Sequence, residues 1–251
     1  MALLTEHFKE ELEEISRTLR REIKLKAAEF DDLVELNFGE LENNACSLIV
    51  LSISQAFGGR NRSAISLAII LQYIFMADQV HRLMTDDPDL EESKRQFPVL
   101  VGDFLYGKFF LNLCKEKMLH YLAPLAKIIE SMNQGAINRW LAKDEDVDQA
   151  EFIKILEMER AALTGLAARL GAELAGCPVK VQNQCELIGW NLGLAWAASQ
   201  DHVEDKVINH ALHEARNVLL ELPNPKGHSL GDLIDYIESH LQIRALKLNY
   251  E

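Results

Sequence analysis

Two clusters of acidic residues are the part of the sequence whose residue types and spacing could carry chemistry. The first lies in FMADQVHRLMTDDPD, residues 75–89, where an apolar helical segment runs into Asp86 and Asp87. The second lies far downstream in AASQDHVED, residues 197–205. Carboxylate oxygens are the ligands that magnesium prefers, and facing acidic clusters on helices can hold magnesium together with a diphosphate. The alternative interpretation is a pair of solvated helix ends, because each cluster is short of carboxylates.

Other motifs point to no competing chemistry. His210 and His213 lie one helical turn apart beside Glu214, but the sequence has no Glu-x-x-His pair of the kind that di-iron bundles use. Solvated surface histidines are therefore the simpler interpretation. The sequence also lacks a GxSxG motif, a P-loop and an HExxH motif.

The bulk composition describes an ordinary soluble protein that is unsuited to nucleic acid. Of its 251 residues, 48% are hydrophobic and 26% charged, and the formal net charge is −13. Phosphate backbones need a basic surface, so nucleic acid is disfavoured as a partner. The longest apolar stretch, residues 64–77, contains Ser66, Gln72 and Tyr73 and is shorter than the roughly 18 residues of a membrane span. Without a signal-like N-terminus, a cytoplasmic protein with no membrane span is expected.

The four cysteines have no CxxC spacing and sit in apolar helical settings: Cys46, Cys114, Cys177 and Cys185. Reduced and buried thiols are therefore expected rather than disulfides or metal ligands.

Nearly every segment has the helical period, in which apolar residues recur every three or four positions. Helices are expected over residues 45–57, from Ser63 to about Met84, from Pro98 to about His120, and from Pro124 to about Gly135. Further helices are expected from the acidic segment KDEDVDQAEF to about Gly176 and from Pro178 to the second acidic cluster. Residues 222–229 are expected to break the helical pattern, and a final helix follows them. No strand pattern, repeat or linker interrupts them. The sequence therefore predicts one all-α domain over residues 1–251, a helical bundle of roughly nine or ten helices.

Small residues gather in two late segments, AALTGLAARLGAELAG and GWNLGLAWAAS. Glycine and alanine on one helix face allow close approach of a neighbouring helix, or leave room for a ligand. Close packing is the expected role in a soluble protein.

The stretch FPVLVGDFLYGKFFLNL, residues 97–113, resembles a helix of the trans-isoprenyl diphosphate synthases, the polyprenyl synthetase family. In that family an apolar run with Gly-Asp follows the first aspartate-rich motif. SAISLAIILQYIFMADQVH is similar to the family helix that ends in a histidine before this motif, and LIGWNLGLAWAASQDHVED to the segment leading into the second motif. AALTGLAARLGAELAG resembles the helix after the family's Lys-Thr pair, and HALHEARNVLLELPNPKGHSLGDLIDYIES its last two helices. The resemblance covers nearly the whole chain in order and implies an isoprenoid-synthase-like bundle.

The first acidic motif departs from the family pattern. In active members a DDxxD motif follows the histidine, and its carboxylates hold the magnesium ions that bind the allylic diphosphate. Here His81 is followed by Arg82 and Leu83 where the two leading aspartates would stand, and Asp86, followed by Asp87, keeps the last carboxylate. A positive charge at Arg82 opposes the binding of a dication.

The second motif is degenerate as well. Gln200 replaces its first aspartate, Asp201 remains, and Glu204, followed by Asp205, stands where the third aspartate would be. The terminal helices follow Asp205 closely, which implies that the domain is shortened after this motif.

Two diphosphate-binding elements are changed too. Glu159 and Arg160 correspond to the Lys-Thr pair, so that an anion replaces a cation. The early stretch that grips the second diphosphate in the family falls near GELENNACS, where Glu40 and Glu42 occur and no arginine does. Ionisation of an allylic diphosphate needs several cations on the leaving group, so this chain is not expected to perform it alone.

A chain with these losses resembles the non-catalytic small subunit of heterodimeric long-chain synthases, of the heptaprenyl or hexaprenyl diphosphate synthase type. The resemblance implies a homologous catalytic partner that holds Mg²⁺ and condenses isopentenyl diphosphate onto allylic diphosphates for quinone side chains, including menaquinone. No cofactor is expected in this chain itself, and self-association in isolation stays open. The alternatives are a stand-alone protein that binds or senses a prenyl chain, and an atypical stand-alone prenyltransferase using Asp86, Asp87, Asp201, Glu204 and Asp205.

Two further sets of residues are candidates for function. The apolar stretch 98–122 provides possible interface residues, although core packing explains each equally well: Tyr106, Phe109, Phe110 and Leu113. In the family, side chains before the first motif limit the length of the product, and here Phe75 and Ala77 would border such a cavity. Asp78 makes a poor wall for a hydrocarbon, so it is expected to face solvent, a partner or a paired cation.

Overall fold

The computed structural model describes residues 2–23, 39–59, 62–85, 89, 91–142, 147–223 and 225–248. Every regular element in these ranges is a helix, which confirms the all-α prediction. The order of the elements is α1 (Ala2–His7), α2 (Lys9–Ile23), α4 (Glu40–Ala56), α5 (Arg62–His81), α6 (Glu92–Lys115), the 3-10 turn η1 (Leu119–Tyr121), α7 (Leu122–Leu141), α8 (Gln149–Leu156), the π-helical turn η3 (Glu157–Ala161), α9 (Ala162–Leu174), α10 (Val179–Gln200), α11 (Asp205–Glu221) and α12 (Ser229–Leu248).

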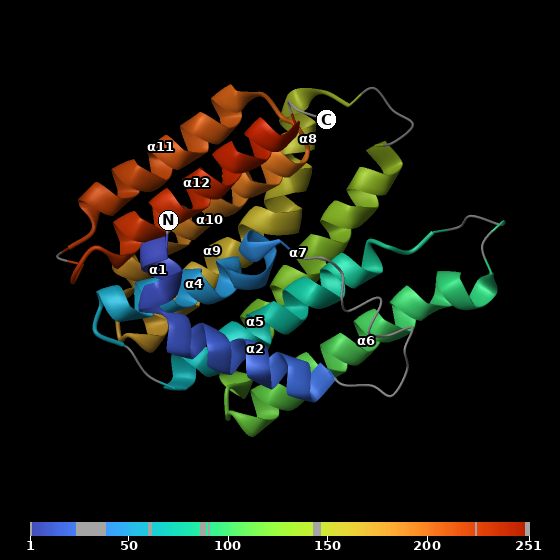
Figure 1. The fold of residues 1–251 in the computed structure, drawn as a ribbon, viewed down its shortest axis with the longest axis horizontal. Helices are drawn as coiled ribbons and strands as arrows, with labels where there is room; N and C mark the ends of the chain where they lie inside the picture. Colours follow the sequence, from blue (N-terminus) through green and yellow to red (C-terminus); the bar gives the residue numbers. More distant parts are fainter. Residues whose placement is uncertain are drawn as a thin grey trace.

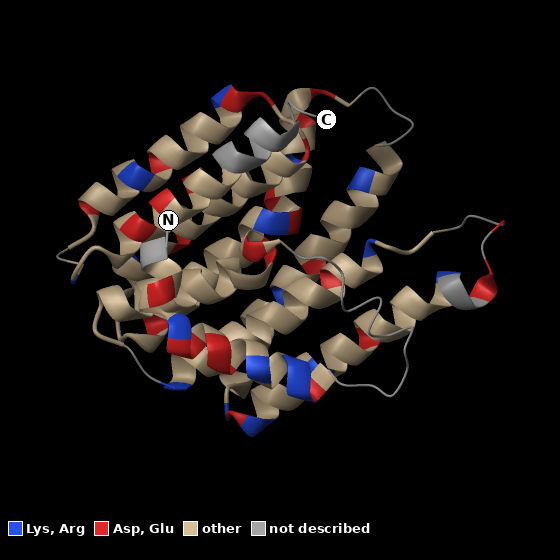
Figure 2. Ribbon diagram, viewed as in Figure 1, with Lys and Arg blue, Asp and Glu red and all other residues tan. Residues whose placement is uncertain are grey.

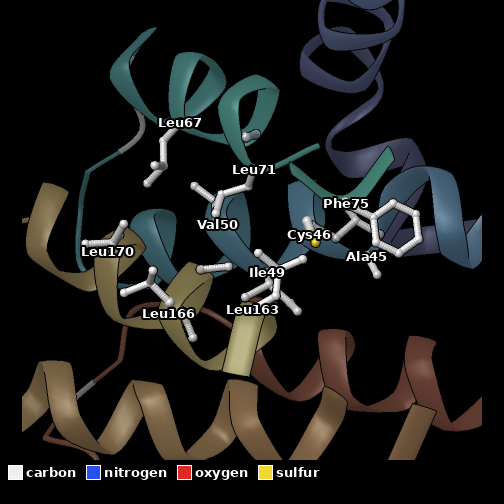
Figure 3. Packing of buried hydrophobic residues seen from close by; sticks show 14 of the residues in the cluster. Ala45, Cys46, Ile49, Val50, Leu67, Leu71, Phe75, Leu163, Leu166 and Leu170 are labelled. Atoms are coloured by element: carbon white, nitrogen blue, oxygen red, sulfur yellow. The ribbon is translucent and has the colours of Figure 1, made fainter. Parts of the chain in front are cut away.

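Helix α4 lies at the centre of the bundle and packs against α5, α9 and α12 (Figure 1). Its apolar residues are buried on nearly all sides, and Ile49 and Val50 meet Leu71 of α5 and Leu166 of α9 in one cluster (Figure 3). An apolar helix with no polar face is stable in water only where other helices surround it. Residues 64–77 of the neighbouring helix α5 are buried too, except Ile65, so this hydrophobic stretch is a core helix, as expected.

Helices α9 and α10 approach each other closely through their small residues. A Cβ atom at Gly193 would lie 1.9 Å from Oγ1 of Thr164, and one at Gly189 would lie 2.3 Å from the Thr164 carbonyl oxygen. These glycines have ordinary helical geometry, so they are needed for space rather than for backbone freedom. The close-packing interpretation of the two small-residue segments is confirmed.

Several helix boundaries differ from those expected: α4 begins at Glu40 rather than residue 45, and α6 ends at Lys115 rather than near His120. Helix α6 begins at Glu92, so that Pro98 lies inside it rather than at its start. A hydrogen bond from Gln96 Nε2 to Glu92 Oε1, 2.7 Å long, supports this extra first turn. Helix α7 continues past Gly135 to Leu141, because Gly135 faces a neighbouring element instead of ending the helix.

The N-terminal helix α2 is held by the half-buried glutamate Glu22. Glu22 accepts hydrogen bonds from Tyr73 Oη (3.0 Å) and Asn112 Nδ2 (2.9 Å), and Lys115 Nζ lies 3.4 Å from its other oxygen. Because Tyr73 belongs to α5 and the other two residues to α6, this single carboxylate connects three helices.

All four cysteines are free. Burial raises the pKa of Cys46 and of Cys185 to about 12, so both thiols are protonated and inert at neutral pH. Cys177 is buried as well. The expectation of burial was wrong for Cys114, which lies on the exposed side of α6.

Helix α6 is long, apolar and only partly covered. By length and composition, two helices in the described ranges are apolar enough to cross a membrane. In the first, within α5, 83% of the apolar window is buried in the bundle; in the second, residues 95–115 of α6, only 39% is buried. Few charges interrupt α6 between its ends, in contrast to the densely charged α2 (Figure 2). Helix α6 thus presents an apolar surface to its surroundings.

Candidate functional site

The first acidic motif follows the end of α5. The imidazole of His81 lies against Gly102 of α6, with its Nε2 atom 3.4 Å from the Val99 carbonyl oxygen and 3.6 Å from Oδ1 of Asp103. The motif histidine thus packs on the Gly-Asp pair of the next helix. Asp86 and Asp87 lie outside the described residues.

Arg82 turns back into the bundle and pairs with two buried carboxylates. Its Nε atom lies 2.8 Å from Oδ2 of Asp78, and its Nη1 atom lies 3.0 Å from Oε1 of Glu159. Burial by itself lowers the pKa of Arg82, but the two carboxylates outweigh this effect and raise it overall. The side chain of Asp78 is 4% exposed and is paired with Arg82. Of the three environments expected for Asp78, the structure therefore shows the paired cation.

Arg139, in the last turn of α7, bridges two acidic residues from distant parts of the chain. Its Nη2 atom lies 2.6 Å from Oε2 of Glu159, and its Nη1 atom lies 2.6 Å from Oδ1 of Asp201. Both carboxylates receive two or more hydrogen bonds from this one guanidinium. Burial by itself lowers the pKa of Arg139, but the hydrogen bonds and charges of Glu159 and Asp201 outweigh this effect and raise the pKa strongly.

We call the five residues Asp78, Arg82, Glu159, Arg139 and Asp201 the ion cluster. It joins α5, α7, η3 and the end of α10 through consecutive pairs. Sequence reasoning missed Arg139, because it is a lone arginine in INRWL with no acid or motif beside it.

Glu159 reaches the centre of the cluster because of two local features. The chain makes a π-helical turn over Glu157–Ala161, and this turn buries Glu159, Arg160 and Ala161 in succession. Across from it, a Cβ atom at Gly135 would lie 2.7 Å from Cγ of Glu159, so only glycine on α7 leaves room for this side chain.

Of the second acidic motif, Asp201 alone joins the ion cluster. Gln200 donates from Nε2 to Oε1 of Glu42 at 2.9 Å instead. Glu204 and Asp205 are exposed where α11 begins, and Glu204 pairs with Lys206. The four residues predicted as one motif therefore have three different environments.

Arg160 is a buried guanidinium whose contacts are mainly aromatic. Its Cζ atom lies 4.5 Å from the ring centroid of Phe75 and 4.4 Å from that of Trp196. The residue is 5% exposed, and its buried Nη1 atom has no hydrogen-bond partner. Burial lowers the pKa of Arg160, with an opposing contribution from Asp78. Such a guanidinium is stabilised by the faces of the rings but lacks a full set of acceptors.

A pocket of about 200 Å³ opens at the ion cluster. Its lining consists of Gln79, Arg82, Arg139, Glu159, Arg160, Ala197, Gln200 and Asp201. Three guanidiniums line it against two carboxylates, and both carboxylates are already paired. Within the described ranges, no group of three His, Cys, Asp or Glu side chains is arranged to hold a metal ion. This lining does not fit the magnesium-diphosphate site that the family resemblance implies.

The two cavity candidates lie in the packed core. Phe75 and Ala77 are fully buried, and the ring of Phe75 stacks at 5.6 Å from Trp196. Phe75 also belongs to the apolar cluster around α4 (Figure 3). Neither residue lines the pocket at the ion cluster.

The candidate interface residues divide between core and surface. Phe109 and Leu113 are fully buried within the chain and belong to its hydrophobic core, which favours the core-packing explanation for these two. Tyr106 is half-buried beside His81, and Phe110 is 48% exposed. Leu100 and Leu111, which were not singled out, are exposed on the same helix. The spacing of apolar residues predicts an apolar helix here, but it does not tell which of these residues face the bundle and which face outward.

Two curated relatives are similar to parts of this chain, whereas no protein-family model matches it. Octaprenyl diphosphate synthase of Escherichia coli is 22% identical over 163 residues, which are 61% of this chain and 50% of the relative. (2E,6E)-Farnesyl diphosphate synthase of Mycobacterium tuberculosis is 30% identical over 183 residues, 65% of this chain and 50% of the relative. The chain thus spans about half the length of these relatives.

Solved structures share the fold along nearly the whole chain. A decaprenyl diphosphate synthase from Rhodobacter capsulatus superimposes with a TM-score of 0.77 at 14% identity, covering 95% of this chain and 98% of the other. A mint heterotetrameric geranyl pyrophosphate synthase superimposes with a TM-score of 0.75 at 16% identity, covering 93% of this chain and 99% of the other. The geranyl diphosphate synthase small subunit of Antirrhinum majus superimposes with a TM-score of 0.72 at 15% identity, covering 93% of this chain and 98% of the other. These structures show that the fold is that of prenyl diphosphate synthases, and the similarity in sequence to such enzymes rests on the curated relatives.

Proposed function

We propose that this polyprenyl-synthase-like chain is the non-catalytic small subunit of a heterodimeric long-chain trans-polyprenyl diphosphate synthase. In this proposal a homologous catalytic subunit holds Mg²⁺ and condenses isopentenyl diphosphate onto allylic diphosphates in the cytoplasm. The product would supply quinone side chains, such as that of menaquinone.

The observation that carries the proposal is the ion cluster. Metal-assisted ionisation needs free carboxylate oxygens for the cations and free cations for the leaving diphosphate. Here Arg82 and Arg139 are directed at the carboxylates of Asp78, Glu159 and Asp201, so these charged groups are paired with one another. A synthase-like fold with its charged groups paired in this way supports a role through a partner.

The uncovered side of α6 supports the presence of such a partner. Leu100, Phe104 and Leu111 follow one another at helical spacing, with Leu100 and Leu111 exposed, and Phe110 lies beside them. Ile137 and Trp140 of α7 are exposed as well. A stable interface buries on the order of 1,200–2,000 Å² and has apolar and aromatic residues at its centre. Among the structural neighbours, one is named as a small subunit and another as heterotetrameric, which is consistent with this role.

The experiment is a prenyltransferase assay on the purified chain, on a full-length synthase from the same organism, and on the two co-expressed. We expect no turnover by this chain alone with magnesium and both substrates, and turnover by the co-purified pair that exceeds the catalytic subunit alone. Turnover by the isolated chain above a matched blank would favour the atypical enzyme instead. Absence of any pairing, combined with binding of a prenyl diphosphate, would favour the stand-alone binding protein.

The surface is tested by Leu100→Glu/Leu111→Glu, which places charge on the uncovered side of α6. We expect loss of co-purification with unchanged helical content, because both side chains are exposed and outside the core. Leu220→Glu is the matched control: Leu220 is 85% exposed on α11, on the opposite side of the bundle (Figure 1), and its change should leave pairing intact. Normal pairing by the α6 variant would reject this surface.

A further inference from the structure

The ion cluster uses every oxygen of its three carboxylates. Both oxygens of Asp78 accept from Arg82, with Oδ2 also accepting from Gln79. Oε1 of Glu159 accepts from both arginines and Oε2 from Arg139. In Asp201, Oδ1 and Oδ2 accept from Nη1 and Nη2 of Arg139.

The charges also balance within the site. Three carboxylates face two guanidiniums inside the cluster, and Arg160, which lines the same pocket, supplies the third positive charge. Asp78 and Glu159 are 4% and 5% exposed in their side chains, so water screens them little. Without the arginines, buried like charges from α5, η3 and α10 would repel one another across the cleft.

We infer that Arg82 and Arg139 take the electrostatic place of divalent cations in this cleft. They hold α5, α7 and α10 together with no bound ion. A divalent ion needs oxygen lone pairs that these carboxylates already give to N–H donors, and it would lie beside two fixed positive charges. The inference concerns this chain alone and stands whether or not it pairs with a catalytic subunit.

The first measurement is thermal unfolding of the wild-type protein in EDTA and in millimolar MgCl₂ or CaCl₂. We expect the same Tm in all three solutions. A rise in Tm with either ion that Asp201→Asn abolishes would show that the cleft still takes the ion, and would overturn the inference.

The second measurement uses Arg82→Gln and Arg139→Gln. Arg82→Gln leaves the buried Asp78 without a cation, and Arg139→Gln leaves Asp201 without one and Glu159 with one arginine instead of two. We therefore expect Tm in EDTA to fall by on the order of 10 °C in each variant. Millimolar Mg²⁺ or Ca²⁺ should restore part of the loss, because the uncovered carboxylates then attract cations. An unchanged Tm, or a loss that neither ion restores, would reject replacement of cations by arginines.

A conservative variant keeps the test decisive where a glutamine variant does not fold. Arg139→Lys keeps the charge and loses the bidentate geometry, so its Tm should fall less and its response to Mg²⁺ should be absent. Arg169→Gln is the control for a surface pair: Arg169 and Glu186 lie 2.8 Å apart and are about one-third exposed, so the change should be small and insensitive to the ions. Stabilisation of Arg139→Lys by Mg²⁺ would contradict the inference.

Discussion

The imidazole of His81 occupies the space that a side chain at Gly102 would need: a Cβ atom there would lie 2.0 Å from Nε2. We expect Gly102→Ala to lower the free energy of unfolding by about 1–3 kcal/mol, because the histidine must leave its position against α6. Urea denaturation measures the change. Gly107→Ala is the matched control on the same helix, where a Cβ meets nothing within 4 Å and the better helix propensity of alanine should stabilise by about 0.5–1 kcal/mol. Equal effects at both positions would contradict the packing explanation.

The contact between Gly193 and Thr164 predicts a larger defect. Gly193→Ala puts a methyl group 1.9 Å from Oγ1 of Thr164 and 2.9 Å from Cα of Ala161, and the second of these is backbone that cannot turn away. We expect α9 and α10 to separate and the free energy of unfolding to fall by about 3 kcal/mol or more. Gly231→Ala on α12, where a Cβ is unobstructed, provides the comparison. An unchanged free energy of unfolding in Gly193→Ala would mean that α9 and α10 lie farther apart in solution than in the structure.

Arg160 predicts a loss of stability on substitution. Arg160→Met keeps apolar contact with Phe75 and Trp196, but removes the positive charge that balances the third carboxylate beside the ion cluster. Removal of one partner from a buried group of charges costs about 3–5 kcal/mol, because it leaves a buried charge uncompensated. Chemical denaturation of both proteins checks this expectation. A neutral or stabilising effect would show that the charge of Arg160 does not balance the cluster.

Glu22 predicts a specific sensitivity to acid. Burial alone would raise the pKa of Glu22, but hydrogen bonds from Asn112 and Tyr73 and the charge of Lys115 lower it overall. A depressed pKa contributes stability above the unfolded-state pKa of about 4.3, and this contribution is lost as the pH falls through the lower folded-state value. Glu22→Gln should therefore be less stable than wild type at pH 7, with the difference shrinking below about pH 4. A difference that stays constant with pH would exclude this role of the carboxylate.

The sequence predicted the architecture better than the site. Helical periodicity located α4, α5, α9 and α10, because burial imposes that period directly on the residues. The pairing of Asp78 with Arg82 is also local, at i and i+4 on one helix. The bridge from Arg139 to Glu159 and Asp201 is different: it depends on how far α7 extends past Gly135 and on the π-helical turn. Neither leaves a pattern in neighbouring residues, so the centre of the ion cluster emerged only from the packing.

The interlocking of the ion cluster has a consequence for the evolutionary path of this chain. Substitution of Arg82 alone leaves Asp78 without its cation, substitution of Arg139 alone leaves Asp201 without its cation, and either change leaves Glu159 with one arginine instead of two. Substitution of Glu159 alone by lysine would leave three cations together beside Arg160. Each single substitution within the cluster therefore passes through a less stable protein. Selection for stability alone would oppose every such substitution made singly, so the members of the cluster are expected to change together or not at all.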